Sequence, residues 1–393
     1  MIVYLDNSAT TRQYDQVTKE MTRMMDEDYG NPSSLHRMGM IAERAVKQAR
    51  KTVAASLGVR EETIYFTGSG TEADNTAIFG AAFTRKRRGN HIITSKVEHP
   101  AVLEVCRKLE RIGYQVDYIN VNEKGLVDID EIKQKLNDKT ILVTVMYVNN
   151  ELGTVQPISE IGKIVKTKGD ILFHSDAVQA YGKIPLDLDS RLIDLLSISG
   201  HKIHGPKGTG ALYVKRGLHI EPYLIGGGQE RGFRSGTENT PGIVGFGLAA
   251  EIMNQSAFKR IDSIKKARNY LLEGIKAEIK DIHINSPETV YESEDFKKPV
   301  SSPSILNVSF LGCRGEVLLH SLEQQNIYVS TGSACSSKKK GSHVLEAAGL
   351  DANCIDSAIR FSFSEFNTIE QMDYVLEGLK KAVDNIRKLM RHR

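Results

Sequence analysis

The sequence lacks the features that mark membrane-spanning, secreted and metal-binding proteins. No apolar run reaches about 18 residues, the length that a membrane helix needs. The first residues, MIVYLDNSATT, contain no basic stretch followed by a long apolar one, so no secretion signal is indicated. Only four cysteines are present, with no CxxC pair and no spacing typical of a zinc or cluster site. We therefore expect a cytoplasmic protein with free thiols and without a membrane span.

A strong net charge is also missing. The 393 residues include 52 basic and 49 acidic ones, which leaves a formal charge of +3. So weak a net field does not favour direct nucleic-acid binding. Basic runs at 85–88 and 338–340 are interpreted as solvated faces. No internal repeat is visible, the only polar linker of note is 286–303, and the length suits one large domain and a smaller one.

What is present is a regular alternation of strand-like and helix-like segments. Strands are expected at 63–66, 91–95, 115–119, 140–148, 171–174, 192–198 and 211–215, and helices at 36–57, 71–85, 100–112, 129–136 and 158–168. This alternation predicts an α/β fold with a mostly parallel sheet that is covered on both faces.

The remainder of the chain has a different pattern. Helices are expected at 240–255, 256–279, 316–325 and 369–389, and strands at 304–310 and 327–330. A polar joint separates the first two of these helices. We place a domain boundary there and predict a large domain at 14–256 and a small α+β domain made of 1–13 and 257–393.

One stretch, SISGHKIHGPKG at 197–208, places Lys202 between an apolar strand and a glycine-rich turn. Parallel strands deliver such residues to the carboxyl edge of a sheet, where α/β proteins bind ligands. A lysine that forms a Schiff base with pyridoxal phosphate needs a fixed approach and nearby phosphate donors. The alternative is a strand-edge lysine in a tight turn.

A second stretch, TGSGTEADN at 67–75, joins a strand to a helix through two glycines. Backbone N–H groups at such a helix start can bind an anion. The pattern is neither a Walker loop nor GxGxxG, and an ordinary strand-to-helix turn is the alternative. Polar residues at 96–100, 149–151 and 174–179 also stand at the ends of predicted strands, and these ends meet at the same edge of the sheet. The loop at 226–237, with two arginines, is expected to be mobile.

Six motifs follow one another along nearly the whole chain: VEHPAV, VNNELG, SDAVQ, SGHKIHGPKG, RSGT and TGSACSS. With DNSATT at 6–11 and RFS at 360–362, they resemble the cysteine desulfurases of the NifS/IscS type, in the class V aminotransferase group. The resemblance implies the pyridoxal-phosphate-dependent transferase fold, like that of aspartate aminotransferase. That fold has a large domain with a mostly parallel seven-stranded sheet and a smaller α+β domain.

The resemblance also implies pyridoxal 5′-phosphate as cofactor and a role for each matching residue. Lys202 would bind the cofactor and act as the Cα base, Asp176 would pair with the pyridine nitrogen, Gln179 would donate to the phenolic oxygen, and His99, a further catalytic residue, would stack on the ring. The phosphate donors would be Gly70, Thr71, Ser199, His201 and Thr237, the last from the other subunit of a homodimer. Asn150 would lie near the cofactor and the substrate carboxylate, Arg360 would hold that carboxylate, and Asn7 and Asn31 would line the entrance.

Cys335 distinguishes a desulfurase from its aminotransferase relatives. It lies in a loop of small residues at about 330–341, beside three lysines that favour the thiolate. By the resemblance, L-cysteine would be converted to L-alanine, and a persulfide on Cys335 would pass to a sulfur acceptor. A buried structural cysteine is the alternative for Cys335 and is the interpretation for Cys106, Cys313 and Cys354. No resident metal is expected, and a transient iron–sulfur contact at Cys335 is left open.

Two other functions and the identity of the acceptor remain open from the sequence. A selenocysteine lyase, or another pyridoxal-phosphate lyase or transaminase of the same fold, would share most of these residues. A catalytically inactive relative kept as a binding partner is the third hypothesis. The chain departs from the best-known iron–sulfur members in the basic stretch SSKKKGSHVLEA and in ending at Arg393 without their longer tail. The acceptor is therefore an iron–sulfur scaffold, a tRNA-thiolating enzyme or another sulfur carrier.

Overall fold

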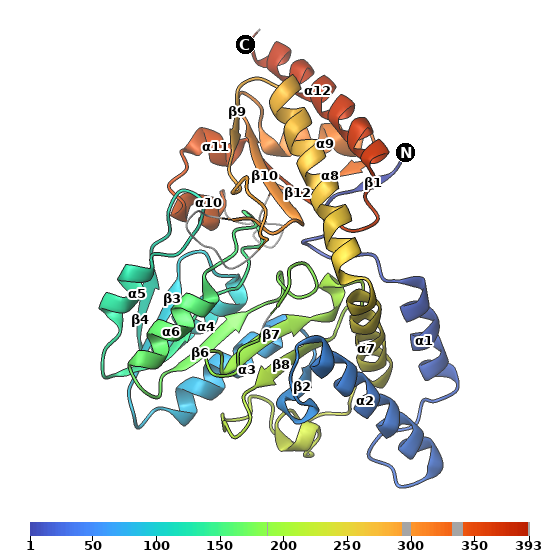
Figure 1. Cartoon of the computed structure of the whole chain (residues 1–393), viewed down its shortest axis with the longest axis vertical. Coiled ribbons are helices and arrows are strands. Elements are labelled where there is room, and N and C mark those ends of the chain that lie inside the picture. The colour runs from blue at the N-terminus through green and yellow to red at the C-terminus, as the bar shows by residue number, and fades with distance from the viewer. Residues whose placement is uncertain (187, 293–299, 332–340, 392–393) are drawn as a thin grey trace.

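The computed structural model describes residues 1–186, 188–292, 300–331 and 341–391. Within them, a seven-stranded sheet forms the centre of the larger part of the molecule (Figure 1). Its strands are β2 (Ile64–Thr67), β3 (His91–Ser95), β4 (Gln115–Ile119), β5 (Thr140–Thr144), β6 (Leu172–Asp176), β7 (Leu195–Ser199) and β8 (Gly210–Val214).

The strands lie in the order β2-β8-β7-β6-β5-β3-β4, and only β8 runs antiparallel to its neighbours. The predicted α/β fold with a mostly parallel sheet is confirmed. The strand before Lys202 is parallel to β6 but antiparallel to β8, so the prediction of a strand with parallel neighbours holds on one side only.

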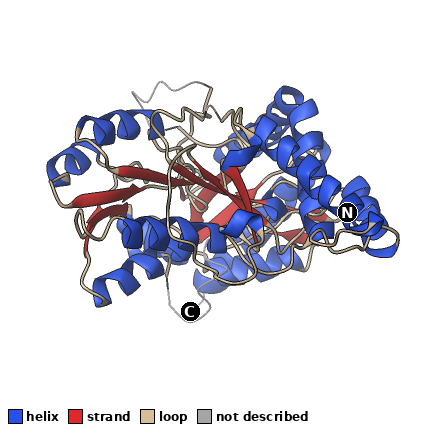
Figure 2. Ribbon diagram, turned by 90° about the horizontal axis from the view of Figure 1, so that it is seen from below, coloured by secondary structure: helices blue, strands red, loops and turns tan. Residues whose placement is uncertain are grey.

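Successive strand residues point to opposite faces, and helices bury both (Figure 2). On β7, Leu195 joins the hydrophobic cluster under α3 (Gly70–Thr84) and α4 (Pro100–Arg111). Leu196 joins the cluster on the other face. That second cluster also contains residues of α2 (Arg37–Ser56), α5 (Ile129–Lys135), α6 (Ile158–Thr167) and α7 (Thr240–Gln255).

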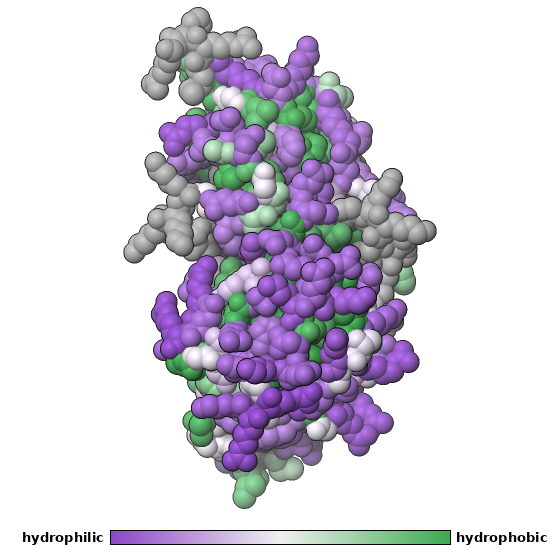
Figure 3. Space-filling model, turned by 90° about the vertical axis from the view of Figure 1, so that its left-hand side faces the viewer, coloured by the Kyte–Doolittle hydropathy of each residue, from purple (hydrophilic) through white to green (hydrophobic). Residues whose placement is uncertain are grey.

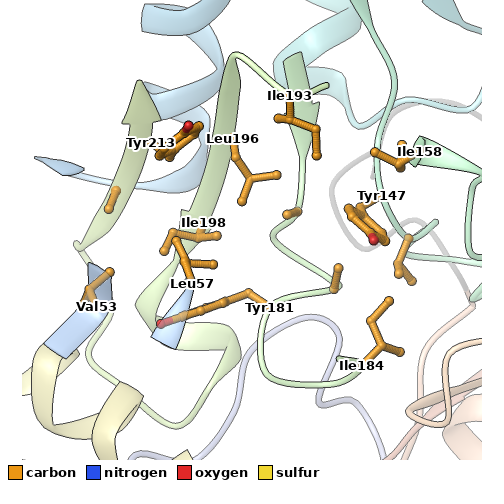
Figure 4. Packing of buried hydrophobic residues seen from close by; sticks show 14 of the residues in the cluster. Val53, Leu57, Tyr147, Ile158, Tyr181, Ile184, Ile193, Leu196, Ile198 and Tyr213 are labelled. Atoms are coloured by element: carbon orange, nitrogen blue, oxygen red, sulfur yellow. The ribbon is translucent and has the colours of Figure 1, made fainter. Parts of the chain in front are cut away.

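Figure 4 shows part of the second cluster, where Leu196, Ile198 and Tyr213 of the sheet lie near Val53 and Leu57 at the end of α2. Tyr181 and Ile184, from the turn after β6, belong to the same cluster. The hydrophobic cluster thus supports the segment that follows β6, because Tyr181 and Ile184 of that segment are part of the cluster.

The C-terminal part contains a second, smaller set of elements, so the predicted small domain is present. An antiparallel sheet has the order β12-β10-β9, and β1 pairs in parallel with β11. The elements are β1 (Val3–Tyr4), β9 (Ile282–Ile284), β10 (Ile305–Phe310), β11 (Ile327–Tyr328), β12 (Ala358–Ser362), α8 (Ala257–Glu278), α9 (Gly315–Glu323), α10 (His343–Ala347), α11 (Ala352–Asp356) and α12 (Ile369–Arg391).

The predicted polar joint lies at Ser256, where α7 ends and α8 begins. The two helices follow one another from the large sheet to the small domain (Figure 1). The residue limits of the two domains stay a prediction. Sequence patterns missed β9, β12, α1 (Asp15–Asp26), α10 and α11. Helix α1 was missed although Val17, Met21 and Met24 recur at helical spacing.

The loop at 226–237 is fixed by contacts within the chain. Glu230 is buried and accepts two hydrogen bonds from Arg50, each 2.7 Å long. Arg231 donates to the carbonyl oxygen of Ile64, and Arg234 donates to Glu72 at 2.8 Å. Both arginines of the loop therefore have structural partners.

The surface in Figure 3 is mainly hydrophilic, with hydrophobic residues in small separate areas. Among the described residues, no helix is both long and apolar enough to cross a membrane. The same residues contain no cluster of three His, Cys, Asp or Glu side chains that could hold a metal ion.

Candidate active site

Lys202 ends a short 3-10 helix, η2 (Gly200–Lys202), directly after β7. Its amine Nζ donates to the carbonyl oxygens of Ser8 at 2.5 Å and Ala9 at 2.8 Å. Two carbonyl dipoles favour the ammonium form of an amine. The N-terminal segment, about 190 residues away in sequence, therefore holds the lysine in place.

The segment after Ala9 runs along the lysine turn. Thr11 donates its hydroxyl to the His201 carbonyl at 2.9 Å, and it accepts from the His204 N–H at 2.8 Å. The His201 ring contacts the Thr10 hydroxyl through Nδ1 at 3.1 Å. Burial, followed by the Lys202 charge, lowers the pKa of His201 to about 3, so this ring is neutral at pH 7.

Asp176 is the last residue of β6 and is buried. Its Oδ1 accepts the Val178 N–H at 2.9 Å. Burial raises the pKa of Asp176 to about 6, and the Val178 N–H and the Lys202 charge oppose that rise. Burial also raises the pKa of two nearby carboxyls, Glu98 to about 8 and Asp74 well above its usual value. Only Asp176 of these three is stabilised as an anion by Lys202, so it is the carboxylate best suited to face a cation.

His99 caps α4 from the end of the segment that follows β3. Its Nδ1 accepts the Ala101 N–H at 3.1 Å, which leaves the ring proton on Nε2. Burial, then Lys202 and His343, lower the pKa of His99 to about 4. A neutral ring in a fixed orientation suits stacking on a planar group.

The glycine loop brings the start of α3 against the end of β7. Ser69 caps the helix by accepting the Glu72 N–H at 3.1 Å. A Cβ added at Gly70 would lie 2.8 Å from Val178 and 3.5 Å from Ser199, so position 70 admits no side chain. Thr71, the next residue, is exposed. This crowding brings the helix start close to the end of β7, where an anion could bind.

Arg360 on β12 is 3% exposed and points its guanidinium at the junction between the two domains. Nη1 donates to the Asn150 carbonyl at 2.9 Å, and Nη2 donates to Asp6 at 2.8 Å. Asn7, which is also buried, donates its amide to the Ser362 carbonyl at 2.8 Å. The small domain thereby contacts the loop after β5 and the N-terminal segment.

Gln179 is buried beside the lysine turn. Its amide nitrogen donates to the Ser8 carbonyl at 3.0 Å, the same oxygen that accepts from Lys202. Its amide oxygen accepts from Lys183 at 2.9 Å. The structure thus brings Gln179 and Lys202 to one shared acceptor.

Asn31 and Thr237 are exposed and lie together away from these contacts. They line a surface cavity of about 280 Å³ that also contains Met25 and Tyr29. Thr237 lines a second cavity, of about 130 Å³, with Gly68 of the glycine loop. In a single chain, neither residue is enclosed by the side chains around Lys202.

Cys335 lies outside the described residues. The other three cysteines are buried, and burial raises the pKa of each thiol, as interpreted from the sequence.

Four residues at the site were not singled out from the sequence: Asp6, Ser8, Ala9 and Lys183. Asp6, Ser8 and Ala9 belong to the DNSATT motif, whose match to the family gave no role to these three residues. Two of them act through backbone carbonyls, which no side-chain pattern reveals. Lys183 had a usable signal, because a lysine stands within the otherwise apolar run AYGKIPL.

Comparisons with known proteins show which family the chain belongs to. The family model described as "Aminotransferase class-V" matches residues 3–375. The chain is 47% identical to a cysteine desulfurase of Trichormus azollae over 99% of this chain and 94% of that one. It is 44% identical to a cysteine desulfurase IscS of Clostridium botulinum over 98% and 96% of the two chains. A solved structure titled "NIFS-LIKE PROTEIN" superposes with a TM-score of 0.90, at 40% identity, over 98% of this chain and all of that one.

The chain therefore belongs to the class V aminotransferases, a family of pyridoxal-phosphate enzymes. Within that family it is a cysteine desulfurase of the NifS/IscS type, which removes sulfur from L-cysteine and hands it to an acceptor. The resemblance seen in the sequence motifs is confirmed.

Proposed function

We propose that this chain binds pyridoxal 5′-phosphate at the carboxyl edge of the seven-stranded sheet and uses Cys335 to accept sulfur from L-cysteine. The observation that supports this most is the convergence of Lys202, which follows β7, with Asp176 and Gln179, which lie at and just after the end of β6. A buried carboxylate suits a pyridinium nitrogen, and the lysine amine suits the aldehyde.

The donor set fits the phosphate as well. The start of α3 at Gly70 and Thr71, the Ser199 hydroxyl and the neutral His201 ring supply donors. The carboxylate in the first turn of α3, Glu72, is paired with Arg234 at 2.8 Å. The buried hydroxyl of Ser8, beside the carbonyl that Lys202 contacts, has no hydrogen-bond partner in the described part of the chain. A polar ligand at this place would satisfy it.

When bound, pyridoxal phosphate supplies an electron sink for the pair left on the substrate Cα. Asp176 keeps the pyridine nitrogen protonated, because a buried carboxylate and a cation stabilise one another. Lys202 removes the Cα proton with its amine. The carbonyls of Ser8 and Ala9, which accept from this amine, then stabilise it as an ammonium.

Arg360 holds the substrate carboxylate with two parallel N–H groups, a geometry that a planar guanidinium provides. Asp6 and the Asn150 carbonyl pre-orient it. The Cys335 thiolate then attacks the substrate sulfur. An S–S bond forms as the C–S bond breaks, the electron pair stays on Cβ, which takes up one proton, and the Lys202 ammonium returns a second proton to Cα to complete L-alanine.

We further propose a homodimer whose second subunit covers Asn31 and Thr237. Tyr29 and Met25, which line the same cavity, are 68% and 52% exposed, and Leu35 nearby is 96% exposed. Such apolar side chains around a predicted ligand contact favour burial by a partner. The acceptor remains one of the three classes predicted from the sequence, and a pull-down with candidate acceptors would distinguish them.

Two variants test the proposal. Lys202→Ala should remove the visible absorbance of the bound cofactor and all turnover while leaving the folded state intact. Cys335→Ser should keep that absorbance and its change on adding cysteine, but should lose alanine production. Mass spectrometry of the wild type after brief exposure to cysteine should find one reducible extra sulfur on the Cys335 peptide. Sulfur mapped to Cys106, Cys313 or Cys354 would contradict the assignment.

A further inference from the structure

Lys183 is a lysine that the proposed mechanism does not use, yet it lies inside the molecule. It is 4% exposed, in the turn that follows β6, and its neighbours Tyr181 and Ile184 belong to the hydrophobic cluster of Figure 4. Lysine is among the residues least often buried without a partner. Its amine donates to the Gln179 amide oxygen at 2.9 Å, so that contact is the natural place to look for its role.

The orientation of the Gln179 amide is determined from both of its ends. On one side the Ser8 carbonyl can only accept, and on the other side the Lys183 amine donates. Turning the amide over would place its oxygen against the Ser8 carbonyl and its NH2 against the Lys183 amine. With both partners present, the NH2 end must face Ser8 and therefore Lys202, which shares that carbonyl.

We propose that Lys183 is a positioning residue that keeps the NH2 end of Gln179 directed at the phenolic oxygen of the cofactor. This inference rests on the proposed role of Gln179. Ser8 alone fixes the amide weakly, because Lys202 also donates to its carbonyl. Lys183 supplies the second constraint, and it does so from the side of the amide that no ligand can reach.

The charges that face Lys183 do not remove this contact. Burial lowers its pKa well below the usual value, Lys202, Arg360 and Arg260 lower it further, and Glu365 raises it. As an ammonium the side chain has three N–H donors, and as a neutral amine it still has two. Either form can donate to the Gln179 oxygen.

The test is a pH titration of the visible absorbance of the purified holoenzyme. A donor to the phenolic oxygen stabilises its anion and so lowers the pKa of the proton shared with the Lys202 nitrogen. In Lys183→Met the amide can turn over, and this transition should move upward by about one pH unit. Lys183→Gln, which restores an N–H donor without the charge, should stay close to the wild type. Lys163→Met on the exposed part of α6 is the matched control and should cause no shift.

Gln179→Leu separates this inference from the function on which it rests. If Gln179→Leu raises the transition and Lys183→Met does not, the role of Lys183 is wrong and the role of Gln179 stands. If Lys183→Met and Lys183→Gln shift equally, the effect is one of charge and the positioning role is also wrong. If Gln179→Leu causes no shift, both roles are overturned. Circular dichroism and cofactor content establish folding, and Lys183→Leu replaces Lys183→Met if the latter does not fold.

Discussion

The wall and the rim of the active site differ in how their side chains are held. The wall consists of Asp176, Gln179 and Arg360, which are buried and have hydrogen-bond partners within the chain. The rim consists of Thr71, Asn31 and Thr237, which are exposed. Electrostatic interactions are strong in the wall, because water is excluded there, and weak at the rim. The described residues of the wall are held within one chain, and we propose that a ligand or a second chain covers the rim.

The largest effect should come from the buried carboxylate of the wall. Asp176→Asn keeps the acceptor for the Val178 N–H but cannot stabilise a protonated pyridine nitrogen. We expect cofactor binding to persist and turnover to fall by on the order of 10²-fold or more. Single-turnover alanine formation measures this. Asp189→Asn, a half-buried aspartate paired with the exposed Arg191, is the control and should change little. A loss of less than about threefold would remove Asp176 from this role.

The same substitution should have the opposite effect on the stability of the cofactor-free protein. The folded-state pKa of Asp176 is raised to about 6 from 3.8, so the folded state binds the proton more tightly than the unfolded state. Its stabilising contribution is present below about pH 4 and is lost as the pH rises through 6. Asp176→Asn removes that loss, on the order of 2 kcal/mol. The difference in thermal midpoint between Asp176→Asn and the wild type should therefore increase in favour of the variant from pH 4.5 to pH 7.5. A difference that stays constant over this range would contradict the burial argument.

Arg360 tests whether geometry or charge dominates in the wall. Arg360→Lys keeps the positive charge but loses the planar fork that contacts both Asp6 and the Asn150 carbonyl. We expect KM for L-cysteine to rise about 20-fold, with a smaller change in kcat. Arg314→Lys, at an exposed arginine 3.9 Å from Asp356, is the control. An unchanged KM would assign the substrate carboxylate to another residue.

The contrast between wall and rim also explains what the sequence could predict. Strands β3 and β4 begin and end at the predicted residues, because short apolar runs bounded by polar residues are local signals. Asp176 and Lys202 were placed at strand ends for the same reason. The strand at 192–198 was expected to have parallel neighbours, yet β8 returns beside it in the opposite direction, which only the long-range topology determines.

Contacts between distant segments could not be predicted. Hydrogen bonds join Ser8 and Ala9 to Lys202, and Asp6 to Arg360. The joined parts of the chain are more than 190 residues apart. Their side chains carry no periodicity, and two of the three partners, Ser8 and Ala9, contribute only backbone oxygen. Such features depend on which surfaces pack together, and packing is decided by the whole fold.

The smallest effect should come from the rim, and it decides which subunit Thr237 serves. Thr237→Ala should weaken cofactor binding about tenfold through the loss of one hydroxyl donor to a charged phosphate. In a mixed dimer, one chain carries Thr237→Ala and the other carries Lys202→Ala. If Thr237 acts across the interface, the site that contains Lys202 of the first chain is completed by Thr237 of the second chain. Cofactor affinity at that site then returns to the wild-type value. If Thr237 acts within its own chain, where it also lies beside Gly68, that site stays about tenfold weaker. Absorbance titration of the mixed dimer with pyridoxal phosphate separates the two results, and the second would overturn the shared active site.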